Sequence, residues 1–257
     1  MDKESLRARY ELALKISEQA SLFLLENEKL GREISSKAEN DYVTLADQEC
    51  ERLIEESILA VFPDDTIFGE ENKVKGNSKG RWIIDPIDGT VNFFNGFPNY
   101  SISIAFEDEE GLAIGVVSVV RQKETFHAMR GEGAFLNGKP IRTNEELDTM
   151  KTVAILVPPH RHHELIDAYM LKMRKFYNHF SDMRSIGSAA CSLCYVACGR
   201  VAVYYEEYLA IYDMAAGVVI LSEAGGKYSY DKKSDYWINL LAGSKRAHDV
   251  SWGIVND

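Results

Sequence analysis

The order of helical and strand-like patterns changes near residues 140–150, and this change restricts the fold more strongly than any other feature of the sequence. Upstream of it, two helical patterns come first and a series of short strand-like runs follows. Downstream, strand-like and helical patterns alternate. Helices followed by a meander indicate an α+β arrangement, whereas alternation indicates an α/β arrangement. We therefore predict an α+β half over residues 1–145 and an α/β half over residues 146–257.

Two amphipathic helices are predicted at the start of the first half. Apolar residues recur at helical spacing over residues 5–28, and Gly31 follows as a C-terminal cap. Thr44 and Asp47 resemble a capping box that begins a second helix, which ends before Pro63. Short strand-like runs follow, and turn residues separate the last three as in an antiparallel meander. These runs occupy residues 66–69, 81–85, 100–106, 112–120 and 124–130.

The second half alternates between the two kinds of pattern. Strand-like sequence occurs at residues 153–157, 201–205 and 238–243, with a shorter run at 185–187, and helical patterns at residues 163–176, 188–198 and 213–223. The chain has 257 residues, of which 46% are hydrophobic, which suffices for one large domain or two closely packed ones. Length alone leaves both possibilities open.

The charge balance restricts the partners of the protein. The chain has 29 basic and 40 acidic residues and a formal net charge of −11, so nucleic acid and anionic membrane surfaces would be repelled. No apolar run approaches the roughly 20 residues of a membrane-spanning helix, and the charged N-terminus does not resemble a signal peptide. We expect a cytoplasmic protein without nucleic-acid or membrane partners. An anionic small substrate can still bind where something local reverses the field.

Two other groups of residues allow a metal-binding interpretation. Cys191, Cys194 and Cys198 could hold a metal ion, but their spacing among small apolar residues favours packing on the buried face of a helix. The histidine-rich residues 158–163 could also bind metal. Their position between a strand and a helix favours an exposed loop and helix start.

A pair of aspartates closes an apolar run. Asp85 follows a buried strand that Pro86 is expected to stop, and Asp88 precedes Gly89 in a turn that leads into a short helix over residues 90–95. Asp88 alone can be explained as a turn residue and helix cap. That explanation leaves Asp85 without a reason to lie at the end of a buried strand. A carboxylate pair beside helix N-terminal amides instead favours a binding site for ions and anions.

Further carboxylates follow or begin other buried elements. Glu70 and Glu71 come directly after the strand-like run at residues 66–69, and Asp213 begins an apolar helix, where it could also act as a simple cap. If these groups share a cleft with the aspartate pair, their repulsion calls for a bound cation. Carboxylate ligands favour Mg²⁺ over Zn²⁺. Bound Mg²⁺ would also attract phosphate to an acidic protein.

These segments carry a resemblance to a known family. The segments 69–71, 85–93 and 212–217, in this order, resemble the three signatures of the inositol monophosphatase family of Mg²⁺-dependent, lithium-sensitive phosphatases. Segments 43–48, 187–190 and 205–206 resemble its flanking motifs. The resemblance covers nearly the whole chain. It implies a layered αβαβα sandwich of the sugar-phosphatase type, a homodimer, and hydrolysis of a small phosphorylated polyol or sugar by metal-activated water.

The resemblance also implies a role for each matching residue. Asp85 would bridge two Mg²⁺ ions, and a third, weaker ion would lie near Glu70. Thr90, hydrogen-bonded to Asp47, would orient the attacking water and relay its proton, although Asp47 could instead serve only as a helix cap. The implied first metal site consists of Glu70, Asp85 and the Ile87 carbonyl, and the second consists of Asp85, Asp88 and Asp213. The backbone amides of Gly89 and Thr90 would bind the phosphate. The remainder of the substrate would contact Asp88, Ser188, Ala189 and Glu206.

Two departures and several alternatives remain within this resemblance. Tyr212 replaces the tryptophan of the third signature, and an aromatic surface is thereby kept. Residues 72–80 are short and rich in Gly, Ser and Lys, so we expect a mobile flap that affects the third metal. Residues 91–93, at the end of the second signature, resemble the inositol phosphatase branch of the family more than the nucleotide bisphosphatase branch, which implies inositol 1-phosphate as the substrate. Fructose 1,6-bisphosphate, dual specificity and a regulatory role in binding the transcription machinery stay open.

Overall fold

The fold is known from a computed structural model. It describes residues 1–28, 34–38, 41–71, 76, 80–145, 148–159, 162–234 and 236–256, with the backbone alone for residues 34–38 and 41–43. The expected cap at Gly31 and most of the expected flap lie outside the described residues.

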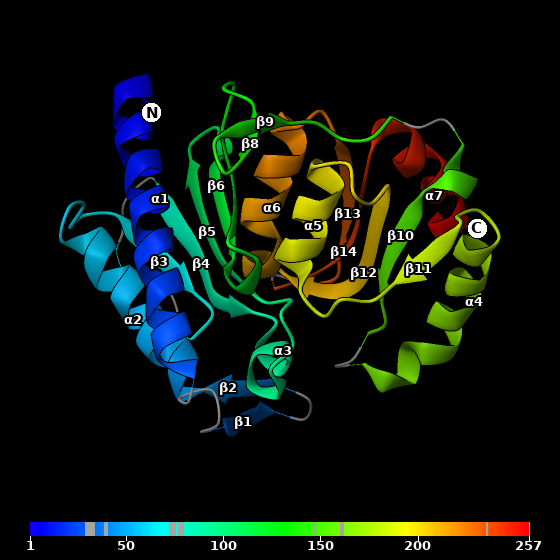
Figure 1. Cartoon of the computed structure of the whole chain (residues 1–257), viewed down its shortest axis with the longest axis horizontal. Helices are drawn as coiled ribbons and strands as arrows, with labels where there is room; N and C mark the ends of the chain where they lie inside the picture. The colour runs from blue at the N-terminus through cyan, green and yellow to red at the C-terminus, as the bar shows by residue number, and fades with distance from the viewer. Residues whose placement is uncertain are drawn as a thin grey trace.

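The chain folds into alternating layers of helices and sheets (Figure 1). One outer helix pair, a seven-stranded sheet, an inner helix pair, a five-stranded sheet and a second outer pair follow one another across the molecule. This arrangement confirms the predicted αβαβα sandwich. The helices of the layers are α1 (Lys3–Glu26) and α2 (Leu45–Leu59), then α5 (Ala189–Ala197) and α6 (Ile211–Glu223), then α4 (Ile166–Tyr177) and α7 (Lys245–Asn256).

The seven-stranded sheet holds the predicted meander. Its strands lie in the sequential order β3 to β9, and only β3 and β4 pair in parallel. The sequence did not predict the short strands β8 and β9. The strands are β3 (Thr66–Gly69), β4 (Arg81–Asp88), β5 (Ser101–Asp108), β6 (Gly111–Val119), β7 (Glu124–Met129), β8 (Ala134–Leu136) and β9 (Lys139–Ile141).

The five-stranded sheet is mixed, in the order β11-β10-β12-β14-β13. Strands β11, β10 and β12 are parallel, β14 runs antiparallel to β12, and β13 pairs antiparallel with β14 at the edge of the sheet. Strand β13 and helix α7 were not predicted, and the expected run at residues 185–187 is not a strand. The strands are β10 (Val153–Val157), β11 (Asp182–Arg184), β12 (Val203–Ala210), β13 (Lys227–Lys232) and β14 (Trp237–Gly243).

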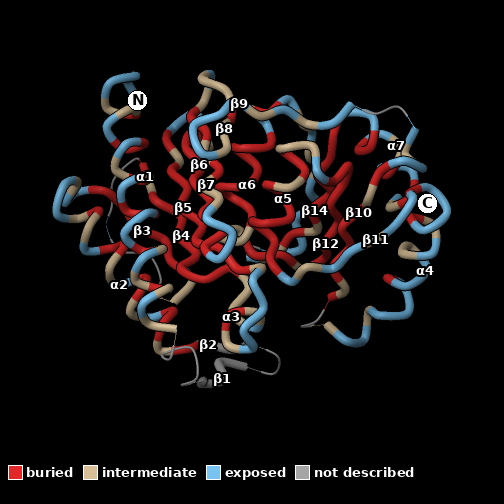
Figure 2. The backbone as a smooth tube through the Cα atoms, in the orientation of Figure 1, coloured by how far each residue is buried: buried red, intermediate tan, exposed pale blue. Residues whose placement is uncertain are grey.

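The largest hydrophobic cluster surrounds the inner helix pair α5 and α6 and includes residues from both halves of the chain. Figure 2 shows this buried interior between the sheets, with the exposed residues on the outer helices and the surface loops. Helix α6 is buried from Met214 to Leu221 because a sheet covers it on each side. A Cβ atom on Gly115 of β6 would lie 2.3 Å from the Ala216 carbonyl oxygen, so glycine permits this close contact. The division at residues 145 and 146 stays a prediction.

Strand β4 corrects one expectation. It does not stop at Pro86 but continues to Asp88, with an irregular register against β5 between Asp85 and Asp88. The Ile87 N–H turns back to donate to Asp85 Oδ1 at 3.0 Å. Proline is tolerated in a strand at such a bulge, because a ladder hydrogen bond is already missing there. The bulge places both aspartates at the end of one strand.

Short elements complete the structure near this end of the sheet. The strands β1 (Ile34–Ala38) and β2 (Asp41–Thr44) form a separate antiparallel pair, and α3 (Thr90–Asn95) is the predicted short helix. Single 3₁₀ turns occur at Val120–Gln122, Thr149–Lys151 and His163–Leu165.

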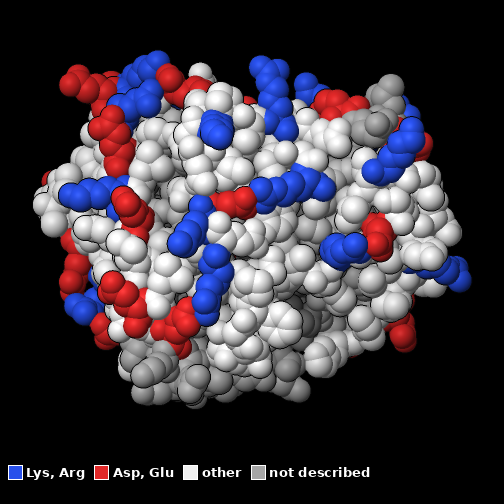
Figure 3. All heavy atoms as spheres, viewed as in Figure 1, with Lys and Arg blue, Asp and Glu red and all other residues white. Residues whose placement is uncertain are grey.

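Within the described residues, no helix combines the length and apolar composition required to cross a membrane. Basic and acidic side chains are interspersed on the face shown in Figure 3.

Candidate active site

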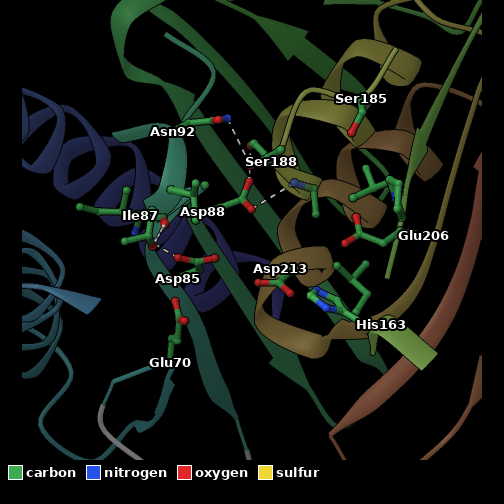
Figure 4. Close-up of a pocket in the computed structure, with 18 residues that line it drawn as sticks. Glu70, Asp85, Ile87, Asp88, Asn92, His163, Ser185, Ser188, Glu206 and Asp213 are labelled. Carbon is green, nitrogen blue, oxygen red and sulfur yellow. Dashed lines mark hydrogen bonds between the residues drawn. The ribbon is translucent and has the colours of Figure 1, made fainter. Parts of the chain in front are cut away.

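A pocket of about 490 Å³ lies where β4 and β12 approach the first turns of α3, α5 and α6. Figure 4 shows that Glu70, Asp85, Asp88 and Asp213 point into this space. Every predicted site residue except Asp47 lines the pocket. The lining residues are Glu70, Asp85, Ile87–Asn92, Val157, Pro158, His163, Ser185, Gly187–Ala189, Glu206, Leu209 and Asp213.

Three carboxylates from distant parts of the chain converge in the pocket. One oxygen each of Asp85, Asp88 and Asp213 lies within 4.8 Å of the others. Asp85 is 1% exposed, and burial raises the pKa of its carboxyl well above the usual range, with further increases from Glu70, Asp88 and Asp213. A group of close, buried carboxylates fits a divalent cation with oxygen ligands. The residues present therefore fit Mg²⁺.

Asp88 is held by the start of α5. Its carboxylate accepts hydrogen bonds from the Ser188 hydroxyl, from the Ala189 amide at 3.1 Å and from the Ala190 amide at 2.9 Å. Ser101 of β5 donates to the same carboxylate at 3.1 Å. Burial raises the pKa of Asp88, and these hydrogen bonds oppose the increase. The Ala189 amide is thus directed at Asp88, and a contact of this amide with substrate stays a prediction.

Asp47 lies behind Thr90, outside the pocket lining. Its Oδ1 atom accepts the Thr90 hydroxyl at 3.0 Å. Its Oδ2 atom accepts the Thr44 amide at 2.8 Å and the Thr44 hydroxyl, which completes the capping box of α2. Burial raises the pKa of Asp47 to about 6, although the hydrogen bonds from Thr44 oppose the increase. The cap and the contact with Thr90 therefore coexist, since each uses a different oxygen.

The turn at Gly89 is tightly packed. Gly89 has φ +94°, and a Cβ atom there would lie 2.9 Å from the Gly187 carbonyl oxygen. Glycine is therefore required both by the backbone conformation and by the close contact. As the residue before α3, Gly89 has no side chain to cap the first-turn amides. This arrangement leaves the amide end of α3 facing the pocket.

Asn92 joins α3 to the loop before α5. Its Nδ2 atom donates to the Asn99 carbonyl oxygen at 2.5 Å and to the Ile186 carbonyl oxygen at 2.7 Å. The second contact spans 94 residues of sequence. Asn92 therefore fixes the loop that carries Ser188 against the turn that carries Gly89.

The opposite wall of the pocket contains Glu206 of β12. Glu206 is 6% exposed and accepts the hydroxyl of Tyr204, which lies on the same face of the strand. An irregular register between Glu206 and Leu209 allows both side chains to line the pocket. Tyr208, within this irregularity, has a left-handed φ of +58°. A carboxylate and an apolar group are thus presented side by side.

Several lining residues were missed as site residues. His163 belongs to the tract that was interpreted as a loop and helix start, and the structure confirms a helical turn at His163–Leu165 that also lines the pocket. Ser185, which also lines the pocket, gave no sequence signal, and neither did Ser101, which supports Asp88. Asn92 lies inside the second signature and could have been chosen on that ground. The remaining histidine-rich residues 160–161 lie outside the described part of the chain.

Two other expectations concern packing. Tyr212 packs on Phe68 with ring centroids 6.3 Å apart, so an aromatic side chain is kept at the position of the replaced tryptophan. Cys191 and Cys194 are fully buried on α5, as predicted, while Cys198 at its end is partly exposed.

The sequence matches the inositol monophosphatase family over residues 2–249. The chain belongs to this family. A protein of Pasteurella multocida named Nus factor SuhB is 41% identical over 192 residues, or 74% of this chain and 72% of that protein. A fructose-1,6-bisphosphatase/inositol-1-monophosphatase of Aquifex aeolicus is 34% identical over 217 residues, or 84% and 82%.

A solved structure shares the fold of this family member. The extragenic suppressor protein suhB of Bartonella henselae superposes with a TM-score of 0.91 at 30% identity, covering 97% of this chain and 99% of that one. Family membership supports a Mg²⁺-dependent phosphatase that acts on a small phosphorylated substrate. The names of the relatives differ, so they leave the substrate open.

Proposed function

We propose that the protein hydrolyses a small phosphate monoester with Mg²⁺, and that the substrate is inositol 1-phosphate. The observation that carries this proposal is the convergence of Asp85, Asp88 and Asp213 within 4.8 Å in a pocket of about 490 Å³. The amide end of α3 borders the same space, where a phosphate would be stabilised. A pocket of this size suits a single small molecule.

The metal would be held by carboxylates from three segments of the chain. Glu70, Asp85 and the Ile87 carbonyl would form one site, and Asp85, Asp88 and Asp213 the other, with a third ion near Glu70. Bound Mg²⁺ would lower the pKa of the attacking water and offset the charge of the phosphate. A cation would also relieve the repulsion that raises the pKa of Asp85.

Thr90 would orient the attacking water. Its hydroxyl lies 3.0 Å from Asp47 Oδ1 and 3.1 Å from the Ile87 carbonyl oxygen. A hydroxyl has one proton, and an ionised carboxylate is the stronger acceptor. Donation to Asp47 would therefore leave the oxygen lone pairs of Thr90 to accept a hydrogen bond from water. Asp47 then acts through Thr90, as a positioning residue that can also receive the relayed proton.

The alcohol part of the substrate would face the wall opposite the aspartates. Glu206 and Asp213 can accept hydrogen bonds from the hydroxyls of a polyol, and the Ser188 region closes the pocket beside them.

Fructose 1,6-bisphosphate is the second candidate substrate. The Aquifex aeolicus relative bears both activities in its name, and His163 is a lining group that can donate a hydrogen bond to a second phosphate.

Phosphate release tests these substrates directly. Release from myo-inositol 1-phosphate, fructose 1,6-bisphosphate and 3′-phosphoadenosine 5′-phosphate would be measured with Mg²⁺, with and without lithium. Faster release from the first supports the proposal, and equal rates on the first two mark a dual phosphatase. Release from none of them contradicts an enzyme of this type and favours a binding role. Lithium sensitivity, a homodimer and a cytoplasmic location stay predictions.

A further inference from the structure

Helix α2 carries a second fully buried carboxylate one turn after Asp47. Glu51 is 0% exposed, as is Asp47 itself. An acidic side chain is rarely buried to this degree unless hydrogen bonds or charges compensate the loss of hydration. The proposed mechanism gives Glu51 no role, so its contacts need a separate explanation.

The contacts of Glu51 lie at the end of strand β3. Its Oε2 atom accepts the Glu71 amide at 2.9 Å. A Cβ atom on Gly69 would lie 2.6 Å from Glu51 Cδ and 2.7 Å from each carboxylate oxygen. Only a residue without a side chain leaves room for the carboxylate in this position. Glu51 therefore contacts the chain immediately before and immediately after Glu70.

The backbone of Glu70 is fixed on both sides as a result. The Glu70 amide donates to the Ile84 carbonyl oxygen of β4 at 3.2 Å, and the next amide along the chain donates to Glu51. The Glu70 side chain leaves the chain between these two hydrogen bonds and enters the pocket beside Asp85. Its direction thus depends on the position of Glu51.

We infer that Glu51 is a positioning residue that directs Glu70 toward the metal site and so determines how tightly the Glu70 side of that site binds Mg²⁺. This inference rests on the proposed Mg²⁺-dependent function. A carboxylate behind a ligand also adds negative charge near the cation. Partners of this kind orient metal ligands, and their loss typically weakens metal binding by about 10- to 100-fold.

Helix α2 contacts two further segments of the site in a similar way. Asp47 accepts the Thr90 hydroxyl, and the Cys50 thiol lies 3.7 Å from the Pro86 carbonyl oxygen at the β4 bulge. Glu51 adds the third contact, to the segment after β3. One helix therefore contacts the water-orienting residue, the bulge between the two aspartates and the Glu70 segment. Rigid supporting elements of this kind hold ligands in a productive geometry.

The test compares Glu51→Ala with Glu51→Gln in the full-length protein. Glutamine keeps an oxygen that can accept the Glu71 amide, whereas alanine removes it. In steady-state assays on myo-inositol 1-phosphate, we expect Glu51→Ala to raise the half-saturating Mg²⁺ concentration about 10- to 100-fold. At saturating Mg²⁺, kcat should stay within about 3-fold of the parent, because Glu51 touches no reacting atom. Glu51→Gln should recover most of the Mg²⁺ affinity.

A binding measurement separates this role from activity. Melting temperatures would be recorded in EDTA and then at increasing Mg²⁺, together with calorimetric titration of Mg²⁺. In Glu51→Ala, the Mg²⁺-dependent rise in melting temperature should require a higher Mg²⁺ concentration than in the parent. This holds whatever the melting temperature of the variant is in EDTA. Glu55→Ala is the matched control, because Glu55 is a buried glutamate one turn further along α2. Its Mg²⁺ dependence should equal that of the parent.

Gly69→Ala tests the same geometry from the other side. The new methyl group would displace the Glu51 carboxylate, so this variant should also need more Mg²⁺. In a background of Glu51→Ala the substitution should have little further effect, because the clash is gone. Additive effects of the two substitutions would contradict the inference.

The inference and the proposed function fail in different ways. Unchanged Mg²⁺ affinity in a folded Glu51→Ala protein overturns the inference while the parent remains a phosphatase. A parent that hydrolyses none of the substrates, but binds Mg²⁺ less tightly when Glu51 is replaced, contradicts the proposed function and leaves the inference standing. A variant with normal Mg²⁺ affinity and a reduced melting temperature in EDTA assigns Glu51 to stability alone, which also overturns the inference.

Discussion

Thr90 Oγ1 lies 3.0 Å from Asp47 Oδ1, while the other oxygen of the same carboxylate caps α2. Asp47 is therefore held at a fixed angle by a helix terminus before it contacts Thr90. This arrangement needs no movement to present the Thr90 oxygen to the pocket. Removal of the Thr90 hydroxyl should therefore affect the rate of hydrolysis directly.

Thr90→Ala should reduce kcat by roughly 100- to 1000-fold, because the group that orients water and relays its proton is lost. Thr90→Ser should retain much of the rate, since its hydroxyl can still reach Asp47. Calorimetric titration should show near-parental Mg²⁺ binding in both variants. An alanine variant as fast as the parent would exclude the proposed role.

Asp85→Asn should separate stability from metal binding. Asparagine keeps an oxygen for the Ile87 amide but removes a charge that Glu70, Asp88 and Asp213 repel. In EDTA, we expect the free energy of unfolding to equal or exceed that of the parent. The stabilisation by Mg²⁺ should be lost, together with most activity. Urea unfolding with and without Mg²⁺ measures both effects, and a Mg²⁺ response like that of the parent contradicts the ligand assignment.

Asn92→Ala should loosen the loop that carries Ser188. Two hydrogen bonds to backbone carbonyls are removed, and a loss of about 1.4 kcal/mol in binding would raise KM about tenfold. Asn95→Ala is the matched control. Asn95 lies on the same helix, is exposed, and donates locally, to the Val91 carbonyl oxygen at 2.8 Å. Equal KM values for the two variants would show that the loop does not depend on Asn92.

The stability of the metal-free protein should fall as pH rises. Burial raises the folded-state pKa of Asp47 to about 6, above its reference value of 3.8. An acid whose pKa is raised in the folded state contributes its full stabilisation at a pH below the pKa of the unfolded state. This stabilisation is lost as the pH rises through the pKa of the folded state. The free energy of unfolding in EDTA should therefore decrease between about pH 4 and pH 6.5, and Asp47→Asn should reduce the slope. A slope that the substitution leaves unchanged would assign the pH dependence to other groups.

The sequence predicted the elements that have a clear apolar pattern. It also predicted the carboxylates that lie at the ends of buried elements, where an acidic residue is unusual. The buried runs of β4 and β6 and the apolar stretch of α6 from Met214 to Leu221 are of the first kind, and Asp85 and Asp213 are of the second. Strand β13 was missed because it is a polar edge strand with charged residues along it. The end of β4 was placed too early, since the usual effect of Pro86 does not apply at a bulge.

The unpredicted parts of the site depend on contacts with backbone atoms. Asn92 contacts the carbonyl of Ile186, and Glu51 contacts the amide of Glu71. Every residue has such groups, so residue spacing cannot single out these partners. Gly69 was visible as a glycine before Glu70, but the carboxylate that requires it lies 18 residues earlier in the chain, on another element.

The shared carboxylate of Asp47 has a consequence for thermostability engineering. Redesign of a helix start is a common route to a more stable variant, because cap residues can usually be exchanged without cost to function. On α2 that freedom is absent, since a substitution chosen to strengthen the cap would also move the partner of Thr90. Stabilising changes are therefore better made on elements that do not border the pocket.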